Sequence, residues 1–302
     1  MPQTLWKRSV RMERAFDRRG RPLTRLERIE QSIIRKFRKD VWRPFTRGVR
    51  EYELISEGDR IAVCISGGKD SMLLAKCMQE LQRHGEKRFE LVFLTMDPGY
   101  SAENRKKIEE NAAVLGLDLQ IFGTQIFEAV ENAESPCYLC ARMRRGYLYA
   151  NAQKLGCNKI ALGHHFDDVV ETILMSMTWA AEYRTMMPKL RSTNFPGMQL
   201  IRPLYYVHEQ DILRWQESAI TAWAKYNGLE FIRCACRVTE KSEDAEDAGK
   251  RAETKRLLAE MRKTNPNVDR NIFRSVHSVN LETIIGWRDG EKRSSFLDRY
   301  DG

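Results

Sequence analysis

The sequence predicts an α/β fold in which a mostly parallel β-sheet carries helices on both faces. Short apolar runs rich in β-branched residues alternate with helical segments of about 10–15 residues, a pattern typical of βαβ units. A Gly-Gly turn follows the first run, at the edge where such sheets bind ligands. We expect this fold over residues 51–240. A basic helical N-terminal arm (1–50) and a helical C-terminal tail (241–302) are expected to flank it.

Each element is predicted from apolar periodicity and from the residues that end it. A helix over residues 24–37 is expected, with Thr24 and Glu27 at capping-box spacing. Gly116 and Gly156 are expected to end the helices that precede them. Strands are expected at residues 60–65, 89–96, 119–123 and 159–163. Further helices are expected at residues 71–81, 102–115, 142–155, 167–179, 209–226 and 242–263.

Composition excludes several classes of protein. The chain has 302 residues, of which 42% are hydrophobic, enough for a sizeable core. The longest runs without charge reach only 10 residues, as at 172–181, whereas a membrane span needs ~20 apolar residues. No apolar segment follows the first basic residues, so we expect no secretion. Seven cysteines, an odd number, fit a metal or redox role in a reducing cytoplasm better than a disulfide framework.

The net charge of +9 is concentrated at the N-terminus. Residues 1–50 contain 16 Lys and Arg against 5 Asp and Glu, whereas the rest of the chain contains 35 against 37. Such a segment indicates a polyanionic partner, nucleic acid before membrane. The alternative is a solvated helical face.

The Gly-Gly turn has the features of a phosphate site. Ser66, Gly67, Gly68, Lys69, Asp70 and Ser71 follow one predicted strand and open the next helix. Bare glycine amides and a helix N-terminus bind phosphate, Lys69 adds a positive charge, and Ser71 adds a hydroxyl. The loop is not a Walker A motif, since Asp70 separates Lys69 from Ser71.

SGGKDS resembles the signature of the PP-loop ATP pyrophosphatases, which cleave ATP between the α- and β-phosphates and adenylate a carbonyl oxygen. LGHHFDD at 162–168 resembles the second signature of the branch that thiolates tRNA. PCYLC at 136–140, RMRRG at 142–146, IRPL at 201–204 and the later cysteine pair are similar to the tRNA 2-thiocytidine synthetases of that branch. The resemblance covers about residues 50–237, and more loosely 271–285. It implies a PP-loop/HUP-like, Rossmann-type fold.

Cys137 and Cys140 are spaced to share one metal centre, and nearby arginines and a helix start would lower their pKa. The resemblance implies a [4Fe–4S] cluster held by three cysteines, with one iron open to sulfide. The family has a second C-x-x-C where this chain has Cys234 and Cys236 one residue closer. We expect Cys236 as the third ligand, with Cys234 as the alternative. A zinc-bound or reduced pair is also open, and the remaining cysteines are expected to be small buried hydrophobes: Cys64, Cys77 and Cys157.

Acidic residues and a histidine complete the predicted site. Asp167 and Asp168 open a helix, and Mg²⁺ beside ATP takes one or two carboxylates plus phosphate oxygens. The alternative for Asp167, Asp168 and Asp70 is helix capping. Lys69, Asp70, Asp167 and Asp168 are the expected catalytic residues. Strand-end residues that face a ligand in such sheets complete the ATP site: Asp97, Gly163 and His164.

We therefore expect a cytoplasmic, ATP- and Mg²⁺-dependent tRNA sulfurtransferase. The resemblance implies that the enzyme adenylates the 2-oxo group of a base, and a cytidine in the anticodon loop is the base we expect. Sulfur from a cysteine desulfurase or from sulfide then replaces this oxygen. Thiolation of a uridine or thymidine is the alternative within the same chemistry. An RNA-binding protein with a structural zinc is the alternative from another class. No membrane contact is expected, and a homodimer is left open.

Overall fold

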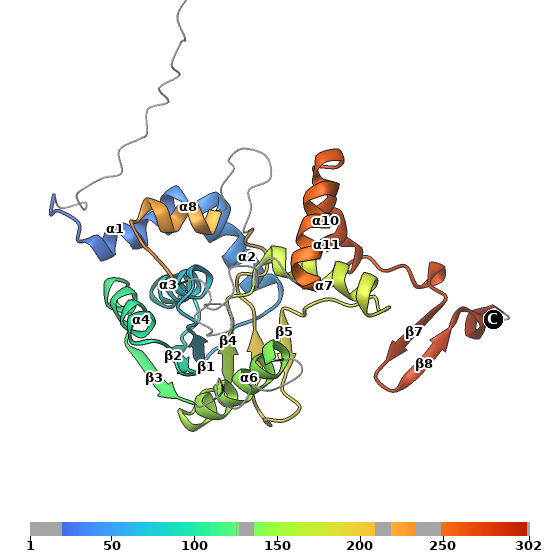
Figure 1. Ribbon diagram of the computed structural model, residues 1–302, viewed down its shortest axis with the longest axis horizontal. Coiled ribbons are helices and arrows are strands. Elements are labelled where there is room, and N and C mark those ends of the chain that lie inside the picture. The colour runs from blue at the N-terminus through green and yellow to red at the C-terminus, as the bar shows by residue number, and fades with distance from the viewer. Residues whose placement is uncertain (1–19, 125, 127–135, 209–218, 233–248, 301–302) are drawn as a thin grey trace, which may run out of the picture. The chain divides into compact units, whose positions relative to one another are not determined.

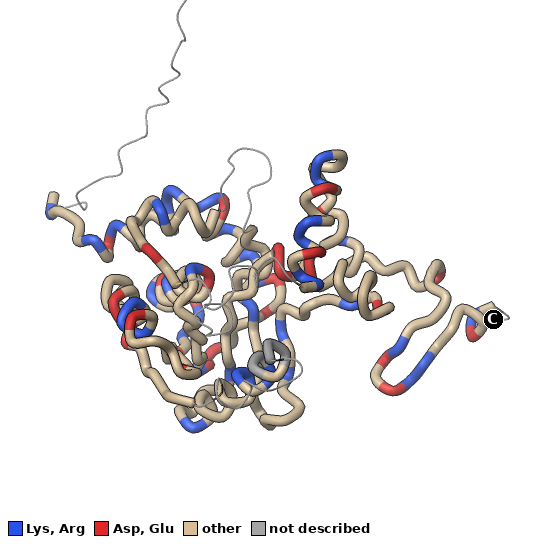
Figure 2. The backbone as a smooth tube through the Cα atoms, viewed as in Figure 1, with Lys and Arg blue, Asp and Glu red and all other residues tan. Residues whose placement is uncertain are grey.

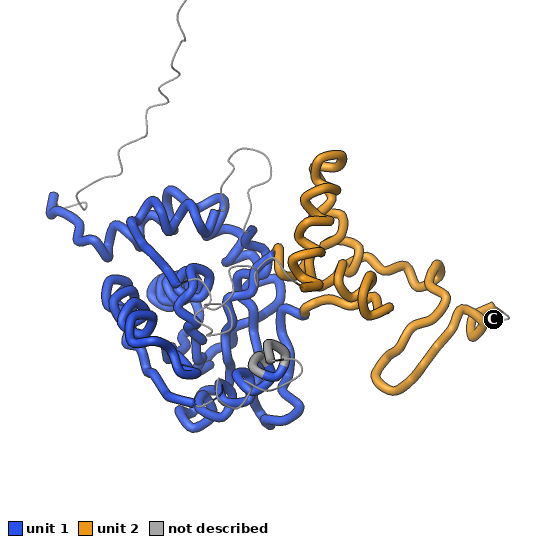
Figure 3. The backbone as a smooth tube through the Cα atoms, viewed as in Figure 1, with its two compact units in different colours: residues 1–166, 187–245 blue, residues 167–186, 246–302 orange. Residues whose placement is uncertain are grey.

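The computed structural model describes residues 20–124, 126, 136–208, 219–232 and 249–300. The chain divides into two compact units, one of residues 1–166 and 187–245, the other of residues 167–186 and 246–302 (Figure 3). This division follows contacts within the fold, whereas the boundaries at residues 50 and 240 rest on composition.

A six-stranded sheet forms the centre of the first unit. Its strand order is β3-β2-β1-β4-β6-β5. All neighbouring pairs are parallel except β5–β6, which is antiparallel at the edge. The predicted fold class is thereby confirmed. The strands are β1 (Arg60–Cys64), β2 (Glu90–Asp97), β3 (Leu119–Gly123), β4 (Lys159–Ala161), β5 (Lys189–Arg191) and β6 (Gln199–Ile201).

The strand order reverses at β1. From β1 the chain moves outward to β2 and β3, then returns to place β4 on the other side of β1. Connections therefore leave the carboxyl ends of β1 and β4 in opposite directions. A crevice for ligands forms at such a switch point in open α/β sheets. The loop of residues 66–71 begins there.

Helices cover both faces of the sheet (Figure 1). Ile61 and Val63 lie in one hydrophobic cluster, whereas Ala62 and Cys64 lie in another, as the period of two along a strand requires. The first cluster includes residues of α3 (Lys69–His84), α4 (Ala102–Val114) and α8 (Ala219–Tyr226). The second includes Tyr149 and Ala152 of α6 (Pro136–Lys154).

The basic N-terminal segment packs into the first cluster. It comprises α1 (Arg25–Gln31), two π-helical stretches (Ser32–Lys36 and Arg38–Trp42) and α2 (Arg43–Glu51). Ile29, Ile33, Val41 and Phe45 are at most 1% exposed. The basic residues of this segment are exposed, and Figure 2 shows their positions along its backbone. The capping box at Thr24 is confirmed, but the expected helix to residue 37 ends at Gln31 and continues as π-helical turns.

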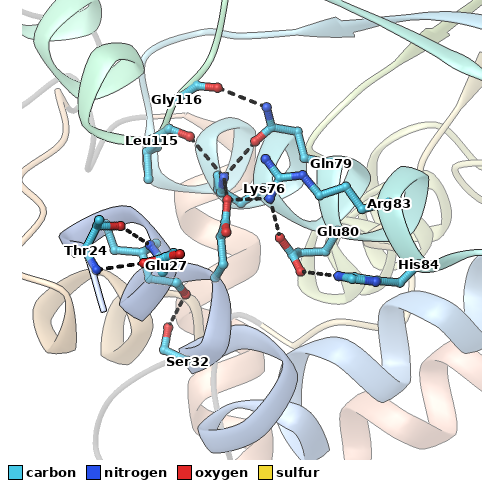
Figure 4. A network of polar contacts seen from close by, with 12 residues as sticks. Thr24, Glu27, Ser32, Lys76, Gln79, Glu80, Arg83, His84, Leu115 and Gly116 are labelled. Carbon is cyan, nitrogen blue, oxygen red and sulfur yellow. Dashed lines mark hydrogen bonds and ion pairs between the residues drawn. The ribbon is translucent and has the colours of Figure 1, made fainter. Parts of the chain in front are cut away.

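Lys76 of α3 links this segment to α3 and to the end of α4 through hydrogen bonds (Figure 4). Its side chain is fully buried in α3, and its Nζ donates to Glu30 Oε1 at 2.8 Å, Gln79 Oε1 at 2.7 Å and the Leu115 carbonyl at 3.0 Å. These three acceptors satisfy all three ammonium protons. Burial lowers the pKa of Lys76, and Glu30 opposes that shift. Removing Glu30 would leave a buried charge without its counter-ion, a costly change.

The second unit contains α7 (Phe166–Trp179), α10 (Lys250–Thr264), α11 (Val268–Ser275) and a hairpin of β7 (Gly286–Asp289) and β8 (Lys292–Ser295). The hairpin corrects the expectation of a wholly helical tail. Its two-residue loop is Gly290-Glu291, between the paired residues Asp289 and Lys292, and a glycine with positive φ (+59°) at the first loop position is a sequence signal for hairpins. Residues 209–218 and 242–248 of two expected helices lie outside the described residues. No helix among the described residues is long and apolar enough to span a membrane.

Candidate nucleotide site

The loop of residues 66–71 joins the central strand β1 to the N-terminus of α3. Gly67 has a φ of +86°, in the left-handed region that side chains rarely adopt. A Cβ at Gly67 would also lie 2.6 Å from Ile232 Cδ1 and 2.7 Å from Ile108 Cγ1. The fold itself therefore requires glycine at this position.

Gly68 is different, since its φ of −79° suits any residue. A Cβ there would meet nothing closer than Ser66 Oγ at 3.7 Å. Gly68 is the N-cap residue of α3, and no side chain caps this helix start. The space that a Cβ would fill lies at a helix N-terminus, where backbone amides bind anions. The loop thus fits a phosphate group that approaches the backbone closely.

Two side chains of the loop already have partners within it. Ser71 Oγ accepts a hydrogen bond from Ser66 N at 3.1 Å and donates to the Gly68 carbonyl at 2.9 Å, so it holds the loop closed. Lys69 Nζ lies 3.2 Å from Asp70 Oδ1. Both side chains of this pair are about one quarter to one third exposed, at 27% and 30%. Lys69 is therefore accessible to a ligand at the helix start.

Gly163, just after β4, lies against the same helix start. A Cβ on Gly163 would lie 3.1 Å from both Ser71 N and Asp70 C. The end of β4 thus fits the loop without space for a side chain. His164 and His165 follow at once, with His164 partly exposed and His165 buried at 5% exposure.

Asp97 ends β2 at the same edge of the sheet and organises the turn that follows. Its Oδ1 accepts hydrogen bonds from Gly99 N at 2.9 Å and Tyr100 N at 2.8 Å. Arg105 Nη1 lies 3.2 Å from its Oδ2. The carboxylate therefore has a structural task here, and its part in binding ATP stays a prediction.

Comparison with known proteins identifies the family of this loop. Residues 29–228 match the PP-loop domain. The chain belongs to the PP-loop family. It is 34% identical over 264 residues to a tRNA-cytidine(32) 2-sulfurtransferase of Geobacter metallireducens, covering 86% of this chain and 96% of that protein. It is 36% identical over 243 residues to the enzyme of the same name from Geobacter sulfurreducens, covering 79% and 89%.

Among solved structures, the U34-tRNA thiolase NcsA from Methanococcus maripaludis with its [4Fe-4S] cluster is similar, with a TM-score of 0.59. That likeness covers 89% of each chain at 17% identity. At this identity it shows a shared fold. It agrees with the PP-loop topology of the sheet.

The acidic pair Asp167 and Asp168 lies in the second unit, in the first turn of α7. Arg251 of α10 lies 3.2 Å from Asp168 Oδ1 and 3.5 Å from Glu171 Oε2. Arg262 lies 4.0 Å from Asp167 and 2.6 Å from Asp269. The described residues contain no group of three or more His, Cys, Asp or Glu side chains that could hold a metal ion. The role of Asp167 and Asp168 in binding Mg²⁺ therefore stays a prediction.

The seven cysteines fall into three groups. Cys64, Cys77 and Cys157 are free and buried, as expected of small hydrophobes. Burial raises the pKa of all three thiols, that of Cys64 to about 12, so none is a ready thiolate. Cys137 and Cys140 lie at the start of α6, which begins six residues earlier than expected. Cys234 and Cys236 lie outside the described residues.

Sequence reasoning missed the arginines that contact the predicted site carboxylates. Arg251 and Asp168 are 83 positions apart, and no periodicity or motif links such a pair. Arg105 lies closer, eight residues after Asp97, but its helix shows many charged positions. A motif search finds the carboxylates, whereas their counter-ions follow only from the fold.

Proposed function

We propose that this protein is an ATP-dependent tRNA sulfurtransferase that replaces the 2-oxo group of a cytidine in the anticodon loop with sulfur. The observation that supports it most is similarity over 96% of the length of a curated tRNA-cytidine(32) 2-sulfurtransferase. The bare helix start at Gly68 adds the phosphate site that such a reaction needs.

The proposed first step is adenylation of the base. The cytidine oxygen attacks the α-phosphate of ATP, a new O–P bond forms, and the bond to the β-phosphate breaks to release pyrophosphate. Amides at the start of α3 and the Lys69 ammonium would stabilise the charge that develops on phosphate oxygens. Mg²⁺ would join them through phosphate oxygens and the carboxylates of Asp70, Asp167 or Asp168. The adenylated oxygen then leaves as AMP when sulfur attacks the same carbon.

Cys137, Cys140 and Cys236 are the proposed ligands of a [4Fe–4S] cluster, with Cys234 as the alternative third ligand. Cysteine thiolates are the donors that bind such clusters. When bound, the cluster would hold sulfide for the attack on the adenylated base; free sulfide, or a cysteine desulfurase together with a thiol that reduces its persulfide sulfur to sulfide, would replenish it. The tRNA would also contact the exposed Lys and Arg side chains between residues 20 and 50. A cytoplasmic location is part of the proposal and suits a reaction on tRNA, and a homodimer is compatible with it.

Nucleoside mass spectrometry tests the proposal. A strain without the gene should lack 2-thiocytidine in its tRNA, and the wild-type gene should restore it. A gene encoding Lys69→Ala should not. Retention of 2-thiocytidine in the deletion strain would contradict the proposal, and loss of a thiolated uridine instead would assign the reaction to another base.

Metal analysis distinguishes the enzyme from a non-catalytic RNA-binding protein. Protein purified without oxygen should contain about four irons with acid-labile sulfide per chain. One zinc and no sulfide would indicate a closed structural site. That result would exclude the proposed sulfur chemistry.

A further inference from the structure

The second unit contains a cleft of ≈ 610 Å³ that the proposed reaction does not use. Its lining comes from the segment after α7, from the segment before β7 and from the β7–β8 hairpin, all within this unit. The residues that carry the following argument are Tyr183, Arg184, Leu281, Ile284, Arg288 and Arg293.

Arg288 and Arg293 form an unusual pair in the hairpin. They lie directly opposite each other in the antiparallel register, and both are exposed. Neither guanidinium group has an ion pair or hydrogen bond with another residue in the described part of the chain. Like charges directly opposite in a sheet destabilise it. An anion between the two guanidinium groups would remove this repulsion, and arginine binds phosphate with two parallel hydrogen bonds.

The rest of the cleft combines apolar and aromatic side chains with three polar ones, those of Glu182, Arg184 and Ser294. Tyr183 is 42% exposed, and Leu281 and Ile284 line the same space. Every nucleobase has a flat face that stacks on aromatic rings. The volume lies in the range of about 300–1,000 Å³ that small-ligand sites occupy. Arg184 also lines the cleft but lies 2.8 Å from Glu182, so it is already paired.

We propose that this cleft binds a single-stranded segment of the RNA substrate. One backbone phosphate lies between Arg288 and Arg293, and one unpaired base lies against Tyr183. This inference rests on the proposed function, because the tRNA supplies the strand. Figure 2 shows basic positions on both strands of the hairpin. An acidic protein segment would match the arginines but offers no base for the exposed tyrosine, so RNA is the occupant that fits both features.

Binding of an unmodified tRNA transcript to the full-length protein, measured over a range of salt concentrations, tests the inference. Arg288→Ala/Arg293→Ala should weaken binding about tenfold and reduce the log–log salt slope by ~0.7 for the lost single-strand phosphate contact. Lys292→Ala is the matched control: it lies in the same hairpin but opposite Asp289 and does not line the cleft. It should leave affinity within about twofold and the slope unchanged.

Tyr183 gives a second, independent measurement. Tyr183→Ala should weaken tRNA binding about fivefold or more, the low end of one base stack, whereas Tyr183→Phe should retain it. The double arginine variant should unfold at the same temperature as the wild type or slightly higher without RNA, because a repulsion has been removed. Added tRNA should raise its unfolding temperature less than that of the wild type.

Equal affinity and equal salt slope for the double arginine variant would overturn the inference. So would a variant that binds tRNA normally but loses self-association, because the hairpin would then be a protein contact. If the wild-type protein thiolates tRNA and these variants bind tRNA as tightly as it does, the RNA-binding role of the cleft is refuted and the proposed function stands. A wild-type protein that binds no tRNA would refute the proposed function as well.

Discussion

A Cβ on Gly163 would lie 3.1 Å from the backbone nitrogen of Ser71. This relationship joins the SGGKDS loop to the LGHHFDD segment, since Gly163 follows β4 and Ser71 lies in the first turn of α3. The atoms that would be met are backbone atoms, which cannot rotate away as a side chain can. The end of β4 and the phosphate loop therefore have to move together.

Gly163→Ala should weaken ATP binding with little loss of global stability. The added methyl group must push the start of α3 by a few tenths of an ångström, and the amides that bind phosphate move with it. Gly123→Ala is the matched control, because Gly123 ends β3, a parallel strand at the edge of the same sheet, and has nothing within 4 Å of a built Cβ. Calorimetric titration with a non-hydrolysable ATP analogue should show weaker binding for the first variant alone. Equal affinities would mean that the loop adapts.

The two glycines of the loop should respond differently to alanine. Gly67→Ala places a side chain in the left-handed region, which costs about 1–2 kcal/mol, and drives it into Ile108 and Ile232. It should lower the free energy of unfolding. Gly68 has an ordinary φ and space for a Cβ, so Gly68→Ala should change the free energy of unfolding by less than about 1 kcal/mol. Its affinity for ATP should fall. Chemical denaturation and calorimetry measure the two effects; an unchanged ATP affinity for Gly68→Ala would indicate that no phosphate approaches this residue.

The parallel core was predictable because buried strands and their helices have clear periods and glycine ends. The strand over 119–123 was predicted with its observed bounds. β5 and β6 were not, because three residues are too few to show a period of two and, unlike β4, neither strand lies in an apolar run that ends at a glycine. The Gly-Gly loop could be located from sequence, but not which glycine the fold itself requires. That distinction between Gly67 and Gly68 depends on neighbours from α4 and from the segment near Ile232.

Lys69→Ala should abolish ATP-dependent thiolation while the fold remains intact. The loss of one charge at the phosphate site removes transition-state stabilisation of about 3–4 kcal/mol, a rate decrease of roughly 10²–10³. Single-turnover thiolation of a tRNA transcript measures it. Lys106→Ala is a suitable control, since this lysine of α4 is 77% exposed. A wild-type rate for Lys69→Ala would remove the lysine from the mechanism.

Arg251→Ala should reveal whether Asp168 binds Mg²⁺. Arg251 and a divalent cation would compete for the same carboxylate, so removing the arginine should lower the Mg²⁺ concentration at half-maximal thiolation. Lys255→Ala, at 3.9 Å from Glu171 rather than Asp168, should shift it less. Titration of activity with Mg²⁺ at fixed ATP checks both variants. If neither variant shifts the curve, Asp168 has a structural role as the partner of α10.

Cys137→Ala and Cys140→Ala should each abolish the [4Fe–4S] cluster. With three protein ligands proposed, loss of one leaves too few thiolates to hold it. After anaerobic reconstitution, the broad visible absorbance and the iron content should be lost. Cys77→Ala is the control, because this buried free thiol has a raised pKa and lies in the core. If both Cys137→Ala and Cys140→Ala retain the cluster, its ligands are other residues.

The third ligand decides between an open and a closed cluster. Cys236→Ala should lose the absorbance, and Cys234→Ala should largely keep it, because one iron must stay free to accept sulfide. Only one residue separates the two cysteines. A turn at Ala235 would direct the sulfurs apart, whereas residues i and i+2 of an extended strand share a face and both thiolates could bind. Iron content and visible absorbance of the two single variants, compared side by side, separate these cases. Equal bleaching of both would show a four-cysteine site with no free position, and the proposed route for sulfur would then be wrong for this chain.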